Sequence, residues 1–146
     1  MFDSLKRRRE QSKAYRLAFE KGRDAGEAIC KAVDGWFTMR IEPIKVNVME
    51  ALQYRLDLIS ESDTNLTERV RIEFEIMFNH WNEQLPKLET ELDFDLREWR
   101  SPAANLGIID DLRKMIKAKF ADVALFMFSR GTDLAYEALV RLKCAL

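Results

Sequence analysis

Two long segments of the sequence repeat apolar residues with the same 11-residue rhythm, and this repeat constrains the fold more than any other feature. In the last third of the chain, apolar or small residues recur at steps of 3, 4 and 4 from Ile109 to Leu142. Eleven residues then fill three turns at about 3.67 residues per turn, which is a helical period. The sequence therefore predicts one long helix with a continuous buried face. The residues of this face are Ile109, Leu112, Ile116, Phe120, Val123, Met127, Gly131, Leu134, Ala138 and Leu142.

Six consecutive apolar residues, Val123 to Phe128, lie at the middle of this predicted helix. They cover all sides of a helix for more than one turn, and a helix that is apolar all round is normally surrounded by other elements. We therefore expect the centre of the fold here. The sequence Gly131-Thr132-Asp133 is a possible point of interruption, with Thr132 as the new N-cap.

The second segment with this rhythm runs from Leu66 to Trp99 and predicts the neighbour of the first, since equal periods keep two apolar faces in register. Asn65 and Glu68 have the spacing of a capping box at its start. Pro86 lies inside it and predicts a kink or two abutting helices. The face consists of Leu66, Val70, Phe74, Met77, Trp81, Leu85, Leu88, Leu92, Leu96 and Trp99.

The first third of the chain predicts two further helices. One starts at Asp3 or Ser4 and is expected to end at Asp34-Gly35, because glycine readily takes the left-handed conformation of a helix stop. The other runs from about Pro43 to Ile59, with proline in the first turn, where it costs least.

An alternative fold must be weighed, because some segments alternate apolar and polar residues as strands do. This α+β alternative has short strands near 36–48, 70–78 and 91–97. However, no glycine occurs between Gly35 and Gly107, so the usual hairpin turns are missing. We therefore predict an all-α fold: one domain, residues 1–146, built as a bundle of four to six long, partly kinked helices. The basic segment 3–23 is expected to be helical and to project as an arm.

Charge is unevenly distributed, although the formal net charge is only −1. Residues 1–23 carry eight basic and three acidic side chains, while residues 61–99 carry four basic and eleven acidic ones. These two segments are candidates to dock against each other. Four basic residues fall on one stripe of the N-terminal helix and form a speculative binding stripe for a phosphate backbone. This stripe consists of Lys6, Arg9, Lys13 and Arg16.

Few residues of the sequence indicate a catalytic, metal-binding or ligand-binding site. His80 is the only histidine, and with Trp81 it forms a speculative small-molecule pocket. Metal coordination normally needs several donors, and we find no phosphate-binding loop, nucleophile elbow or Cys-x-x-Cys motif. In the acidic segment, Glu91, Asp95 and Glu98 share a helix face where a basic partner would be favourable. We expect no catalytic residues, no metal and no cofactor.

These features favour a non-catalytic helical interaction or adaptor protein in the cytoplasm. Ile72 and Ile76 lie opposite the apolar face of the second segment, so we expect a homodimer formed through apolar helix faces. The longest apolar run is six residues, which predicts no membrane span. The alternatives are a nucleic-acid-associated accessory protein that binds through the N-terminal stripe, or a small-molecule-binding helical protein.

Overall fold

The computed structural model describes residues 24–144, and its regular elements are all helical. A helix over residues 24–36 continues directly into a π-helix and then into α2, so that the three form one long rod. The elements after the first helix are η1 (Phe37–Ile41, π-helix), α2 (Glu42–Asp57), α3 (Leu66–Asp95), η2 (Arg97–Trp99, 3₁₀-helix), α4 (Arg100–Asn105) and α5 (Ile109–Cys144). The all-α prediction is confirmed.

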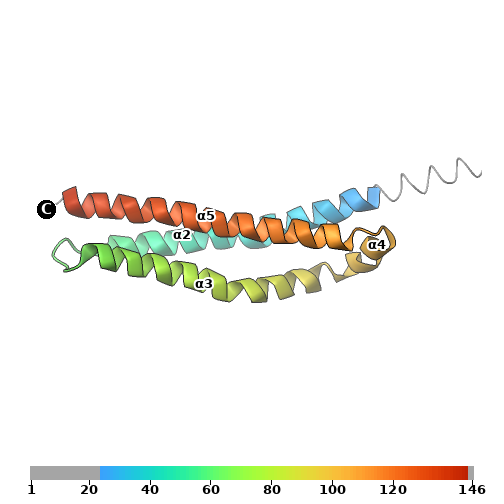
Figure 1. Cartoon of the computed structure of the whole chain (residues 1–146), viewed down its shortest axis with the longest axis horizontal. Helices are drawn as coiled ribbons and strands as arrows, with labels where there is room; N and C mark the ends of the chain where they lie inside the picture. The colour runs from blue at the N-terminus through green and yellow to red at the C-terminus, as the bar shows by residue number, and fades with distance from the viewer. Residues whose placement is uncertain (1–23, 145–146) are drawn as a thin grey trace, which may run out of the picture.

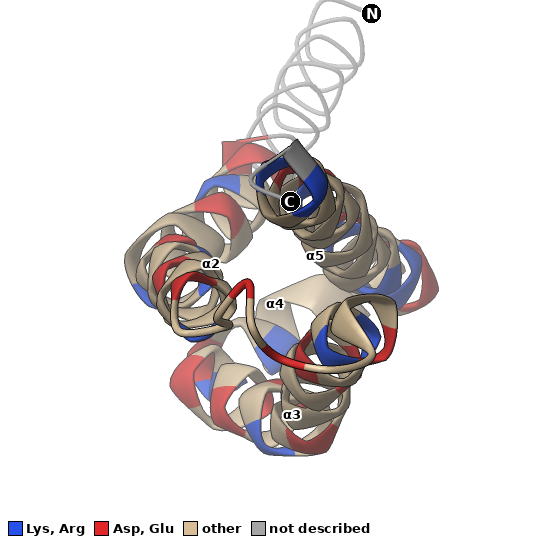
Figure 2. Cartoon of the chain, turned by 90° about the vertical axis from the view of Figure 1, so that its left-hand side faces the viewer, with Lys and Arg blue, Asp and Glu red and all other residues tan. Residues whose placement is uncertain are grey.

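The first rod, α3 and α5 lie side by side in an elongated bundle (Figure 1). The chain runs along the bundle in the first rod, returns in α3, and runs back again in α5, while η2 and α4 connect α3 to α5 at one end. Viewed along the long axis, α2, α3 and α5 surround a common centre (Figure 2). The alternative with strands near 36–48, 70–78 and 91–97 is wrong, because the first segment lies in the rod, the second in α3, and the third at the end of α3 and the start of η2.

The core follows the two predicted 11-residue stripes. Trp81 of α3 and Met127 of α5 are almost completely buried, and every other residue of both stripes is at least partly buried. Phe120 of α5 packs against Trp36 and Phe37 of the rod, with ring centroids 6.3 and 4.8 Å away. The repeat therefore identified both long helices and the faces that they bury against each other.

Helix α5 continues through Gly131 without the interruption considered above. Gly131 is buried where α5 approaches side chains of α3 closely. A Cβ atom at this position would lie 2.7 Å from Met77 Cε and 2.9 Å from Phe74 Cε2. The glycine thus serves close packing between two helices, and it does not end a helix.

Two local features of α3, at Pro86 and at Asn65, differ from the expected ones. It runs unbroken through Pro86, although proline cannot donate the backbone hydrogen bond of its turn. The predicted capping box at Asn65 is wrong, because Asn65 has left-handed backbone angles (φ 55°, ψ 52°) and no capping side-chain hydrogen bond. Asparagine tolerates this conformation better than most residues.

The predicted helix stop at Asp34-Gly35 is also wrong. Gly35 lies inside the helix, and the rod continues because Val33, Phe37 and Ile41 all bury their side chains in the core. These three residues are four apart, and η1 accommodates this wider spacing with a π-turn. The next helix, α2, has Pro43 in its first turn as predicted.

The segment Val123–Phe128 is covered on one side only. Val123 and Met127 are buried, whereas Leu125 and Phe128 are 66% and 52% exposed. The expectation that this stretch is surrounded is therefore wrong within a single chain. Of the described helices, none is long and apolar enough to span a membrane.

Candidate functional site

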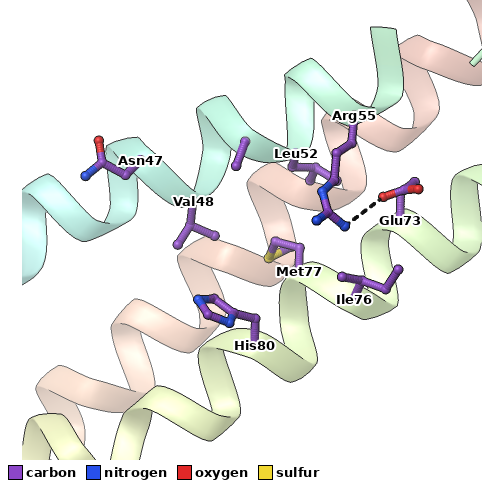
Figure 3. Close-up of a pocket in the computed structure, with 9 residues that line it drawn as sticks. Asn47, Val48, Leu52, Arg55, Glu73, Ile76, Met77 and His80 are labelled. Atoms are coloured by element: carbon purple, nitrogen blue, oxygen red, sulfur yellow. Dashed lines mark hydrogen bonds and ion pairs between the residues drawn. The ribbon is translucent and has the colours of Figure 1, made fainter. Parts of the chain in front are cut away.

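A groove of about 330 Å³ lies between α2 and α3 (Figure 3). Its floor is apolar and includes Val48 and Leu52 of α2 and Met77 of α3. Figure 3 shows His80 near Val48 at one end and the Arg55–Glu73 pair at the other, where Arg55 Nη1 lies 3.4 Å from Glu73 Oε2. The groove thus offers an apolar surface with a polar group at each end, which suits an apolar side chain better than a reacting substrate.

The structure brings only one of the two predicted pocket residues to this groove. His80 is exposed at its rim, whereas Trp81 is turned into the bundle core and is 1% exposed. Neighbouring residues on a helix point about 100° apart, and here Trp81 lies on the core side of α3 while His80 lies outside it. The indole Nε1 of Trp81 has no hydrogen-bond partner among the described residues. Within the same range, no three His, Cys, Asp or Glu side chains gather closely enough to hold a metal ion.

Acidic residues of α3 accept hydrogen bonds from residues of the first rod. Arg40 donates two hydrogen bonds to Glu91, from Nε to Oε2 at 2.7 Å and from Nη2 to Oε1 at 3.1 Å. Trp36 donates from Nε1 to Asp95 Oδ2 at 2.9 Å. The guanidinium group of Arg40 lowers the pKa of the Glu91 carboxyl chiefly through these hydrogen bonds, and Glu91 in turn raises the pKa of Arg40.

Sequence reasoning found the acidic residues of this contact but missed Arg40 and Trp36. The signal that could have found them is the spacing of Val33, Phe37 and Ile41, which continues the buried face of the first helix through Gly35. The contact fastens the rod to the end of α3, and it is structural in character. The predicted basic stripe Lys6, Arg9, Lys13 and Arg16 and the predicted arm 3–23 lie outside the described residues.

A second exposed apolar surface lies on the side of α5 that faces away from the core. Leu125 and Tyr136 are 66% and 68% exposed there, and the helix positions between and around them carry small or uncharged side chains. We call this surface the outer face of α5. It consists of Ala118, Ala121, Leu125, Ser129, Thr132, Tyr136 and Val140.

Charged residues border the outer face on one side. Asp122, Arg130 and Asp133 line a surface hollow together with Leu125 and Ser129 of the outer face. Lys119 pairs with Asp34 of the rod, and Arg141 Nη2 donates to the carbonyl oxygen of Leu56 at 3.1 Å, where it caps the end of α2. Phe126 lies on the same side, under the ammonium group of Lys45. The outer face is therefore an uncharged strip beside a charged flank, which is typical of a helix surface that contacts another protein.

Comparison of the chain with protein-family models, with curated proteins and with solved structures gave no match.

Proposed function

We propose that the protein is a non-catalytic helical interaction protein that assembles with a second copy of itself. The observation that carries this proposal is the outer face of α5, an uncharged strip with large exposed apolar side chains. The exposed apolar side chains of this face, Leu125, Tyr136 and Val140, are separated only by small or uncharged residues, and the centres of protein interfaces are likewise depleted of charge.

The experiment that tests this proposal compares two tyrosines of nearly equal exposure. Tyr136 of α5 is 68% exposed and Tyr54 of α2 is 66% exposed, and both lie within helices. Sedimentation velocity, taken up to high micromolar concentrations, should show a concentration-dependent dimer for the unmodified chain. Tyr136→Glu should abolish the dimer because it places a charge in the interface, while Tyr54→Glu should preserve it.

Three results would contradict the proposed function or the assignment of the contact to α5. A monomer at all concentrations in the unmodified chain contradicts the proposed function. Equal loss of the dimer in both variants, with helical circular dichroism unchanged, contradicts the assignment to α5. A dimer lost only through Tyr54→Glu places the contact on α2.

We place this assembly in the cytoplasm. Cys30 is a free, exposed cysteine, and such thiols persist where the environment is reducing. The nucleic-acid alternative stays a prediction that depends on Lys6, Arg9, Lys13 and Arg16. Retention on heparin that falls steeply with salt would support it, since phosphate contacts release counterions.

A further inference from the structure

We propose that residues 24–36, which we call the leading segment, open away from the bundle as one unit, with η1 as the hinge. The leading segment is the first part of the rod and lies at the end of the bundle where α4 connects α3 to α5 (Figure 1). Its opening uncovers the apolar ends of α3 and α5 and requires no second copy of the chain. Local openings of this kind occur in segments with few buried apolar contacts and solvent-exposed hydrogen bonds.

A cavity of about 400 Å³ lies between the leading segment, the end of α3, α4 and the start of α5. Ile29 and Val33 line it from the leading segment, while Leu92 of α3 and Leu112 and Ile116 of α5 line it from the other helices. Side chains that border a void lose the dispersion contacts on that side. Ile29 and Val33 are therefore almost completely buried and yet incompletely packed.

Apart from Ile29 and Val33, the leading segment buries little apolar surface. Its half-buried positions carry small residues, namely Ala25, Gly26, Ala28 and Ala32. Small residues contribute little, because the stabilisation scales with the apolar area that is removed from water. The remaining large core residue, Trp36, lies next to the hinge, with its ring centroid 5.3 Å from that of Phe37. The apolar contacts that hold the far part of the segment are thus chiefly those of Ile29 and Val33.

Two polar contacts join the leading segment to the other helices. Asp34 pairs with Lys119 of α5, and Trp36 donates a hydrogen bond from Nε1 to Asp95 Oδ2 at 2.9 Å. The Asp34 side chain is 60% exposed, so water can replace Lys119 as its partner at little cost. The ion pair therefore favours the closed state only weakly.

The structure of η1 suits a hinge. Its π-helical turn interrupts the regular hydrogen-bond pattern of the rod, and such turns are frequent at functional sites. Gly35 lies shortly before η1, is exposed, and has a low helix propensity. Within η1, Phe37 packs on Phe120 with ring centroids 4.8 Å apart, and Arg40 donates two hydrogen bonds to Glu91. These contacts keep η1 attached to α3 and α5 while the residues before it move.

Thiol labelling of a buried cysteine on the full-length chain measures the opening. Cys30 and Cys144 are replaced by serine, and one cysteine is introduced by Val33→Cys or, as the matched control in α5, by Val123→Cys. The two valines are only 0% and 6% exposed, so a thiol at either position reacts with a maleimide only when its surroundings open. We expect the thiol introduced at Val33 to react about tenfold faster or more than the one at Val123.

Low urea concentrations distinguish this local opening from global unfolding. Below the unfolding transition, the labelling rate at Val33 should change little with urea, because the opening exposes little surface, while the rate at Val123 should rise steeply. Helical circular dichroism shows whether each variant is folded. Equal rates with equal urea dependence at both positions would mean that the leading segment opens only when the whole bundle unfolds.

Hydrogen exchange of the unmodified chain is a second measurement, and it needs no new cysteine. Opening about a hinge predicts one common protection for the backbone amides of the leading segment, whereas fraying from its start predicts protection that rises gradually toward η1. Asp34→Asn, which removes the ion pair with Lys119, should raise these exchange rates roughly two- to fivefold. The control Glu75→Gln removes an ion pair within α3 and should leave them unchanged.

The hinged opening is supported by faster labelling at Val33 with little urea dependence, a common protection across residues 24–36, and a local effect of Asp34→Asn. Protection that rises gradually along the segment overturns it. Exchange of these amides only through global unfolding, or an effect of Asp34→Asn that is equal along the whole chain, overturns it as well.

Discussion

Gly131 shows how one residue can serve packing where its sequence context suggests a break. Alanine improves helix propensity over glycine by about 1 kcal/mol. At Gly131 the added Cβ would lie 2.9 Å from the ring of Phe74, and overpacking of this kind costs roughly 1–3 kcal/mol. We expect Gly131→Ala to lower the free energy of unfolding by about 1 kcal/mol. Urea unfolding followed by circular dichroism measures this change.

Gly35 is the matched control, because it also lies within a helix but has no atom within 4 Å of the position that a Cβ would take. Gly35→Ala should therefore raise the free energy of unfolding by about 0.5–1 kcal/mol. Two stabilising substitutions of equal size would show that α3 and α5 do not approach closely at Gly131.

The Arg40–Glu91 pair predicts a contribution that depends on pH. Its carboxyl has a lowered pKa in the folded protein, so the pair stabilises the fold above the ordinary glutamate value. The contribution is lost as the pH falls through the lower, folded-state value. Both side chains are nearly half exposed, so we expect a coupling energy of only about 0.2–1 kcal/mol at neutral pH.

A double-mutant cycle with Arg40→Ala and Glu91→Ala measures this coupling at pH 7 and at pH 3. It should be present at pH 7 and smaller at pH 3, because the pH then approaches the lowered pKa of the Glu91 carboxyl. A coupling energy equal at both pH values would mean that packing, and not charge, joins the two side chains.

At the level of the helices, the sequence predicted α3 and α5 well because their apolar residues keep one period over 30 and 36 residues. The helix boundaries were harder to predict, since they depend on contacts between distant segments. Glycine often ends a helix, but the helix continues through Gly35 because Phe37 and Ile41 are buried in the core. Asparagine often caps the start of a helix through its side chain. Asn65 makes no such hydrogen bond and takes a left-handed backbone conformation instead. At Gly35, tertiary packing thus overrides local preference.

Pro86 offers a test of how far α3 tolerates a local defect. Proline within a helix costs about 3 kcal/mol, whereas it lowers the entropy of the unfolded chain by an amount worth only about 0.4–1 kcal/mol. Pro86 is exposed, so alanine would remove no core contact. We expect Pro86→Ala to raise the free energy of unfolding by roughly 2 kcal/mol, measured by urea unfolding. Unchanged or reduced stability would mean that the bundle requires a bend at this position.

For the molecule as a whole, the sequence pattern identifies apolar surface but not the element that covers it. The run Val123–Phe128 has the composition of a buried segment, and the structure buries only the side that faces α3 and the rod. A similar ambiguity applies to Ile72 and Ile76, which are 40% and 42% exposed on α3, with Ile76 lining the α2–α3 groove. The periodicity of apolar residues indicates which side chains are buried away from water. It does not indicate whether they are buried within one chain or between two chains, so the candidate interface could be identified only from the three-dimensional structure.

The π-helix η1 has a consequence for how chains of this type can change in length. Three regular turns of the 11-residue rhythm use 11 residues, whereas the buried residues Ile29, Val33, Phe37 and Ile41 spread over 12. The extra residue is accommodated at η1, and Met39 within it is 83% exposed. A homologous chain that lacks one residue here could form an ordinary α-helix and still direct the same side chains into the core. Evolution can therefore delete a single residue in the middle of this rod, where elsewhere a deletion would rotate half a helix out of register.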